Sequence, residues 1–206
     1  MFARYVEDYI GVLKKLDETT VERLAQVLLG TWRANRTVFC CGNGGSAASA
    51  SHFVLDLTKL TATPRGLRLR AVALTESIAA ISAISNDSAY EEIFSEQLRP
   101  FLAPGDVVIG FSTSGSSPNV LRAVHYANSM GAITIGVTGR HGRRLESIAR
   151  HTLVVQSSSV QQIEDATMMV AHILCLRVKD LIARQQDESA REGLLLPMRP
   201  ADVAAM

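Results

Sequence analysis

The chain has little cysteine, few aromatic residues and no excess of charge of one sign. Its 206 residues include three cysteines, one tryptophan and 5% aromatic residues. Cys40, Cys41 and Cys175 lack the spacing of a metal site, so we expect reduced thiols inside a cytoplasmic protein. Lysine and arginine total 21 against 20 acidic residues, which gives a formal charge of +1. This balance predicts neither nucleic acid nor an acidic membrane as a partner.

Long hydrophobic runs are missing as well. No segment reaches the roughly 18 uninterrupted apolar residues that a membrane-spanning helix needs. Residues 1–11 already contain Glu7 and Asp8 and carry no apolar run, so a secretory signal is not expected. The length of 206 residues predicts one domain with a complete hydrophobic core.

A glycine-rich turn between a predicted strand and a predicted helix is the clearest local signal. Residues 37–39 are β-branched or aromatic, residues 40–46 read CCGNGGS, and a helical run covers 47–60. Glycines let a ligand approach the backbone, and the free N–H groups of the following helix attract anions. Ser46 can cap that helix or donate its hydroxyl. The spacing fits neither GxGxxG nor GxxxxGK[ST], so a phosphate site and a plain glycine turn both stay open.

A second polar turn follows the apolar strand predicted at 107–111. Residues 112–119 read STSGSSPN, with five hydroxyl groups ahead of a helix that we expect to end near Met130. Ser117 suits the N-cap of that helix and Pro118 its first position. Hydroxyls and helix N–H groups together favour a phosphate ligand, and a merely soluble serine-rich loop is the alternative.

Helices and strands alternate along the whole chain. We predict helices at 2–17, 21–35 (capped by Thr19 or Thr20), 75–84 (capped by Thr75), 89–98, 144–149 and 160–183, a turn at 86–88, and further strands at 69–74, 132–137 and 152–155. The alternation predicts an α/β fold, with a doubly wound parallel sheet of five strands flanked by helices. Helices at 1–36 form an N-terminal leader, 37–183 the α/β core and 184–206 a tail. Ligands are expected at the carboxyl ends of the strands.

Two helices carry the side chains best suited to chemistry. His52 and Asp56 are four residues apart and share one helix face, where they can bind a metal, act as acid and base, or form an ordinary surface pair. His172 interrupts an apolar stretch, for which a hydrogen-bonded core histidine is the alternative. Helical angles favour Asp165 over Glu164 as the carboxylate in line with His172. The other histidines are expected to be structural or solvated: His125, His141 and His151.

Four motifs occur in a fixed order within about residues 1–183. They are CGNGGS at 41–46 with His52 six residues further on, SND at 85–87, STSGSS at 112–117, and the histidine-bearing last helix. In this order they resemble the phosphoheptose isomerases of the sugar isomerase (SIS) domain superfamily. The resemblance implies a single SIS domain with a flavodoxin-like sandwich, which converts sedoheptulose 7-phosphate to D-glycero-D-manno-heptose 7-phosphate for heptose biosynthesis. It also implies a homotetramer with sites at subunit interfaces.

The resemblance assigns roles to individual residues. Phosphate contacts fall on Ser112, Thr113, Ser114 and Ser117, and other substrate contacts on Asn43, Gly44, Gly45, Ser46, Asn86, Asp87 and Glu164. Zinc, or another divalent metal, falls on His52, Asp56, Glu164 and His172. We assign Asp56 as the base and His172 as the acid of an enediol mechanism, with the metal polarising the carbonyl.

Two of these assignments depart from the family pattern. The family has glutamate, which is also its base, where this chain has Asp56, and glutamine where this chain has Glu164. The aspartate side chain is one methylene shorter than glutamate, so its carboxylate lies roughly 1.5 Å further from the substrate. A shift of this size can lower the rate about 10²-fold. A carboxylate in place of an amide strengthens the attraction for zinc. The family usually has an arginine where this chain has Leu60. Arg65 is a candidate to take over the role of that arginine.

Two classes of function therefore stay open. The first is a phosphosugar isomerase, acting on the seven-carbon substrate or on another sugar phosphate. The second is a catalytically silent SIS-domain protein that binds a phosphosugar or a replication initiator. His172 favours the enzyme, because a silent protein has no need of an acid there, whereas Asp56 and Glu164 favour divergence.

Overall fold

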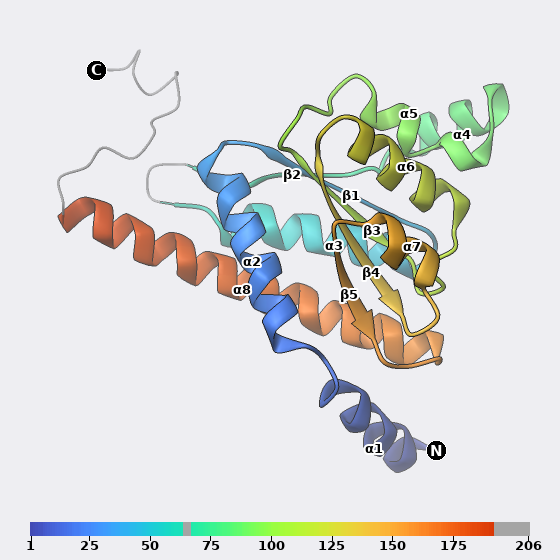
Figure 1. The fold of residues 1–206 in the computed structure, drawn as a ribbon, viewed down its shortest axis with the longest axis horizontal. Helices are drawn as coiled ribbons and strands as arrows, with labels where there is room; N and C mark the ends of the chain where they lie inside the picture. The colour runs from blue at the N-terminus through green and yellow to red at the C-terminus, as the bar shows by residue number, and fades with distance from the viewer. Residues whose placement is uncertain (64–66, 192–206) are drawn as a thin grey trace.

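A computed structural model describes residues 1–63 and 67–191 of the chain. Five parallel strands form one sheet in the order β2-β1-β3-β4-β5, with helices on both faces (Figure 1). This is the strand order of flavodoxin-like doubly wound sheets. Strand β2 is added on one side of β1, and β3, β4 and β5 are added on the other side, so the topological switch point lies between β1 and β3. The predicted fold class is confirmed.

The elements follow the predicted alternation. The strands are β1 (Thr37–Gly42), β2 (Arg70–Ala73), β3 (Val107–Phe111), β4 (Ile133–Gly139) and β5 (His151–Val155). The helices are α1 (Phe2–Leu13), α2 (Glu18–Arg33), α3 (Gly45–Leu60), α4 (Ile78–Asp87), the short 3₁₀ helix η1 (Tyr90–Glu92), α5 (Ser95–Leu98), α6 (Pro118–Ser129), α7 (Arg143–Ile148) and α8 (Val160–Arg191).

The hydrophobic core lies in two layers, one on each face of the sheet. Helices α2, α3 and α8 cover one face, and α5, α6 and α7 cover the other (Figure 1). Cys40 packs in the first layer and the adjacent Cys41 in the second, as alternation along a strand requires. All three cysteines are buried and free, and burial raises the pKa of Cys41 to about 12. These thiols therefore stay protonated at neutral pH.

Several helix ends differ from the predictions. Asp17, rather than Thr19 or Thr20, caps α2, because its carboxylate accepts from the Thr19 N–H at 3.0 Å and from the Thr20 hydroxyl at 2.6 Å. Ser77, rather than Thr75, caps α4 and accepts a backbone N–H at 3.2 Å. In both helices the N-cap side chain accepts a backbone N–H of the first turn, as capping residues do.

The predicted turn at 86–88 and the helix at 89–98 are wrong in detail. Helix α4 continues to Asp87, and residues 89–98 divide into η1 and α5. At the break, Ile93 and Phe94 are buried, and the Gln97 amide donates to the Ile93 carbonyl at 2.6 Å. A side chain thus satisfies a carbonyl that the interrupted helix leaves free.

Helix α8 is longer than predicted. It runs to Arg191 instead of ending at residue 183, because residues 184–191 contain neither glycine nor proline to stop it. The rest of the predicted tail, 192–206, lies outside the described residues. Near the start of α8, Asp165 accepts a hydrogen bond from the Tyr5 hydroxyl of α1 at 2.5 Å, which raises the pKa of Tyr5 to about 12.

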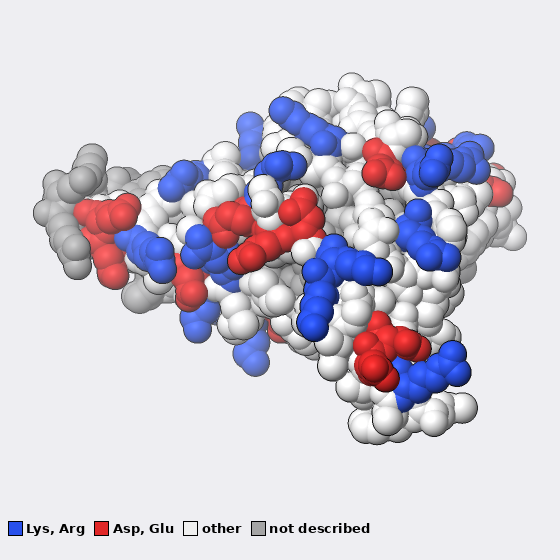
Figure 2. Space-filling model, turned by 60° about the horizontal axis from the view of Figure 1, so that its bottom comes forward, with Lys and Arg blue, Asp and Glu red and all other residues white. Residues whose placement is uncertain are grey.

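The surface matches the balanced charge of the sequence. Figure 2 shows acidic and basic side chains interspersed over one face, without a broad field of either sign. Within residues 1–63 and 67–191, no helix combines the length and apolar character that crossing a membrane requires.

Candidate functional site

The glycine-rich turn connects β1 to α3 at the carboxyl edge of the sheet. Gly44 has a positive φ of 54° and is the N-cap residue of α3. A Cβ on Gly42 would lie 2.7 Å from the Ser46 carbonyl oxygen, so the tight turn requires glycine there. Ser46 lies within the first turn of α3 and is buried, so it does not cap the helix as predicted.

The serine-rich turn connects the neighbouring strand β3 to α6. Ser117 is the N-cap residue of α6 and Pro118 its first residue, as predicted. The Ser117 hydroxyl makes no cap bond and lies 3.1 Å from the hydroxyl of Ser112. The hydroxyl pair therefore stands beside the helix N-terminus, an arrangement that suits an anion.

A pair of amides joins the two turns. Asn43 donates to the Asn119 side-chain oxygen at 2.9 Å, and Asn119 donates back to Asn43 at 2.8 Å. Tyr90 from η1 also donates its hydroxyl to Asn43, at 3.1 Å. The bridge between Asn43 and Asn119 thus holds the two turns in a fixed relation. Sequence reasoning did not find Asn119 or Tyr90; the signal for Asn119 was a polar side chain at the start of a helix with a buried face.

Helices α3 and α8 bring His52, Asp56 and His172 together. The two Nε2 atoms of His52 and His172 are 3.0 Å apart, and Asp56 Oδ2 lies 3.3 Å from His52 Nε2 and 3.7 Å from His172 Nε2. The His172 side chain is 50% exposed, so the alternative of a core histidine is wrong. The predicted convergence of the two histidine-bearing helices is therefore present in the fold.

This group has the donors and spacing of a metal site. Tetrahedral zinc with bonds of about 2.0–2.1 Å holds its ligand atoms about 3.3 Å apart. The three observed separations, 3.0, 3.3 and 3.7 Å, bracket that value. Two imidazoles and one carboxylate are common zinc ligands that leave a coordination position open. The side chains of His52, Asp56 and His172 therefore fit a divalent cation.

Known proteins are similar to this chain in sequence and in fold. A model of the SIS domain matches residues 1–139. The phosphoheptose isomerase of Trichlorobacter lovleyi is 36% identical over 176 residues, which cover 84% of this chain and 89% of that protein. The one from Paramagnetospirillum magneticum is 39% identical over 162 residues, 79% of this chain and 84% of that protein. The chain belongs to the phosphoheptose isomerase family.

A solved structure of this family agrees. The phosphoheptose isomerase of Neisseria gonorrhoeae matches with a TM-score of 0.79 at 31% sequence identity, covering 89% of this chain and 97% of that one. The likeness therefore extends over most of both chains.

Glu164, a metal ligand by resemblance to the phosphoheptose isomerase family, lies apart from the group of three. Its carboxylate fills the space beside Gly45, where any Cβ would collide with it. Asp165, which helical angles favoured, turns instead to Tyr5 on α1. Glu164 thus places a negative charge beside the glycine turn. Because that charge repels phosphate, the glycine turn suits sugar hydroxyls and the serine turn suits the phosphate.

The remaining residues expected from the phosphoheptose isomerase motifs do not all lie in one group. Asn86 and Asp87 are exposed at the end of α4 and hydrogen-bond to each other at 2.8 Å. In the part of the chain that the structure describes, no hydrogen bond joins either one to the two turns. Thr113 is partly buried and Ser114 is exposed on the serine turn. Arg65, the candidate substitute at Leu60, lies outside the described residues.

Gly115 gives a direct test of how tightly the serine turn is built. Its φ is +60°, and a Cβ there would lie 2.6 Å from the Gly142 carbonyl oxygen. We expect Gly115→Ala to lower the free energy of unfolding by about 2–4 kcal/mol, from backbone strain plus this collision. Gly30→Ala is the matched control, because Gly30 lies in α2 with nothing within 4 Å of its Cβ position.

Gly30→Ala should raise the same free energy by about 0.5–1 kcal/mol, because alanine has the higher helix propensity. Urea unfolding of both variants at one protein concentration measures the two changes. Equal stability of the Gly115→Ala variant and the unmodified protein would show that the serine turn is looser than the structure indicates.

Proposed function

We propose that the protein isomerises sedoheptulose 7-phosphate to D-glycero-D-manno-heptose 7-phosphate. The observation that carries the proposal is the convergence of His52, Asp56 and His172 on adjacent helices. The family membership and the two turns at the same edge of the sheet support it. An acid, a base and a phosphate anchor are the parts that an aldose–ketose isomerase needs.

The serine turn is the proposed phosphate anchor. The hydroxyls of Ser112 and Ser117 face each other, and Thr113 and Ser114 stand beside the α6 N-terminus. The glycine turn, Asn43 and Glu164 contact the sugar, with Asn86, Asp87 and Ser46 as further candidates from the resemblance. Binding energy from the phosphate then orients the reacting carbons toward Asp56 and His172.

The reaction moves one proton between adjacent carbons. Asp56 removes a proton from C1 of the ketose, and the electron pair left behind forms the C1–C2 double bond of the enediol. His172 supplies a proton to the C2 carbonyl oxygen. The carboxyl of Asp56 then returns a proton to C2, while the deprotonated His172 takes the proton of the C1 hydroxyl, which becomes the aldehyde, so that both residues regain their starting states.

A divalent cation, for which zinc fits the donor set, would be held by His52, Asp56 and His172 and would polarise the substrate carbonyl. By resemblance Glu164 is a further candidate ligand, but its carboxylate lies against Gly45 and would have to leave that position to bind the cation. A nitrogen that binds a cation cannot donate a proton at the same time. Where the cation occupies His172 Nε2, polarisation of the carbonyl by the cation would take the place of proton donation by His172, which acts as the acid only when that atom is free.

We also propose a cytoplasmic homotetramer whose subunit interfaces complete the site. The group of three is open to solvent, and apolar side chains on the same two helices surround it: Leu55 (58% exposed), Ile173 (42%) and Leu176 (53%). A second subunit over these side chains would remove them and the site from water. Buried free cysteines suit a reducing compartment.

Turnover in D₂O tests the proposal. The protein, supplied with zinc and sedoheptulose 7-phosphate, should yield the aldose with deuterium at C2, because the enediol exchanges its proton with solvent. Unphosphorylated sedoheptulose is the matched control and should react far more slowly, since it lacks the anchor. Binding of the phosphate ester with neither product nor deuterium would instead identify a catalytically silent protein.

A further inference from the structure

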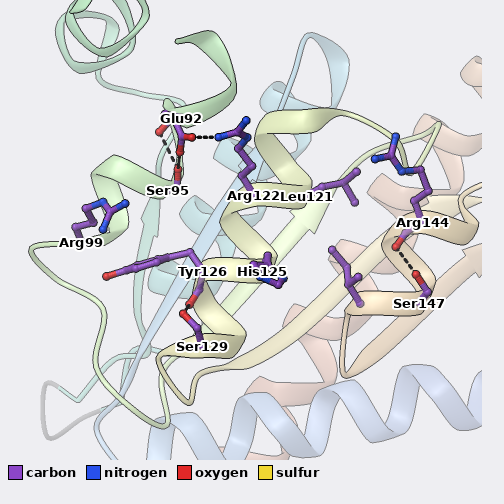
Figure 3. A pocket seen from close by; sticks show the side chains of 11 residues that line it. Glu92, Ser95, Arg99, Leu121, Arg122, His125, Tyr126, Ser129, Arg144 and Ser147 are labelled. Atoms are coloured by element: carbon purple, nitrogen blue, oxygen red, sulfur yellow. Dashed lines mark hydrogen bonds and ion pairs between the residues drawn. The ribbon is translucent and has the colours of Figure 1, made fainter. Parts of the chain in front are cut away.

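A second pocket lies away from His52, Asp56 and His172. It has a volume of about 520 Å³ and lies among η1, α5, α6 and α7, on the face of the sheet opposite α3 and α8 (Figure 3). None of its lining residues is one of the predicted site residues. A volume between about 300 and 1,000 Å³ is typical of small-molecule sites.

The lining is basic. Three arginines, Arg99, Arg122 and Arg144, face one glutamate, Glu92. Figure 3 shows Arg99 and Arg144 at opposite ends of the lining, with Arg122 between them. With three arginines against one glutamate, the lining carries an excess of positive charge, which favours an anion.

The three arginines differ in whether a carboxylate is paired with them. Arg122 is paired with Glu92. Arg99 is paired with Glu96 at 2.7 Å, and its guanidinium lies 5.1 Å from the ring centre of Tyr126. Arg144 differs: among the described residues no carboxylate oxygen lies within 4 Å of its guanidinium. Arg144 is thus available to bind an anion without breaking an ion pair.

The rest of the lining suits a ring. Leu121 and Ile148 supply apolar surface, and His125 and Tyr126 supply aromatic surface between the arginines. Ser129 and Ser147 add hydroxyl groups. An arginine fork matches phosphate oxygens, and apolar and aromatic walls match a sugar or base ring.

We propose that this pocket binds an organic phosphate, with the phosphate on Arg144 and a ring against Leu121 and Ile148. A nucleotide and a pentose phosphate share this chemistry. The site is separate from the proposed isomerase centre and does not depend on it.

Isothermal titration calorimetry of the full chain tests the proposal with AMP, ribose 5-phosphate and inorganic phosphate as probes. At least one ester should bind more tightly than inorganic phosphate. Arg144→Gln should weaken that binding about 10-fold or more, the loss of one charge-assisted contact worth about 1.4 kcal/mol. Arg143→Gln is the matched control, because Arg143 is exposed on the same helix but does not line the pocket, and it should change the affinity less than about twofold.

A second variant distinguishes a loss of the binding site from a loss of folding. Ser147→Trp places a large ring in the pocket and should abolish binding, with an unchanged melting temperature. Repeating the titration with Ser112→Ala, which alters the proposed phosphate anchor of the isomerase centre, should give unaltered affinity and so separates this site from that centre. Binding of AMP alone identifies a nucleotide site, and equal binding of both esters identifies a sugar-phosphate site. Binding that ignores Arg144→Gln, no binding of either ester, or inorganic phosphate binding as tightly, would overturn the proposal.

Discussion

Asp56→Asn is expected to lower kcat for sedoheptulose 7-phosphate by about 10²- to 10⁴-fold, the usual contribution of a general base. The amide keeps the size of the carboxylate but cannot accept the C1 proton. KM should change little, because the serine turn, and not Asp56, anchors the phosphate. Steady-state kinetics with saturating zinc measure both constants.

Asp56→Glu is the informative control for that result. It restores the residue that the family resemblance places at this position and extends the carboxylate by one methylene. We expect a kcat equal to or above that of the unmodified protein, because the base then reaches its proton more closely. If Asp56→Asn retains full kcat, Asp56 is not the base; if both variants lose activity equally, its role is confined to packing.

Zinc binding should depend on the same group of three. His52→Ala is expected to weaken zinc affinity by at least about 100-fold, because second-shell changes alone cost about 10- to 100-fold and this one removes a ligand. Competition with a chromophoric chelator measures the affinity and the stoichiometry. His141→Ala is the matched control, since His141 is an exposed histidine outside the group and should leave both unchanged.

Glu164→Gln tests whether Glu164 is a fourth ligand of the zinc ion. The Glu164 carboxylate lies against Gly45 rather than with the other three, so the amide variant should change zinc affinity less than about 10-fold. Zinc affinity that survives His52→Ala, or that falls as far with His141→Ala, would contradict a metal site made by α3 and α8.

The elements best predicted from the sequence are those with strong local chemistry. The apolar run at Val107–Phe111 and the Ser117–Pro118 helix start need no tertiary information, and both were placed correctly. The pairing of His52 with Asp56 also follows from helical spacing alone. Caps were less predictable, because Asp17, Thr19 and Thr20 offered competing oxygens within four residues and only the backbone path decided among them.

Long-range placement did not follow from local pattern. The position of His172 beside His52 depends on α3 and α8 covering the same face of the sheet, which the family resemblance supplied and spacing did not. The angle between residues within α8 favoured Asp165 as the carboxylate nearest to His172, but α8 packs against both α1 and α3. Its Asp165 side faces α1 and its Glu164 side faces α3, so the angle from His172 alone was the wrong guide.

Residues that act through others were missed for the same reason. Asn119 and Tyr90 hold Asn43 in place, yet neither belongs to a recognisable motif. His125 was expected to be structural or solvated; it is exposed, and its place in the lining of the basic pocket was not predicted. Such roles become visible only when the packing of η1, α6 and α7 is known.

Anomalous diffraction at the zinc absorption edge, from a crystal soaked with zinc and sedoheptulose 7-phosphate, would locate both the cation and the phosphate. We expect a zinc peak within bonding distance of His52 Nε2, Asp56 Oδ2 and His172 Nε2, with a phosphate on Ser112 and Ser117. Zinc bound only elsewhere, or no phosphate on the serine turn, would contradict a catalytic centre formed by α3, α8 and that turn.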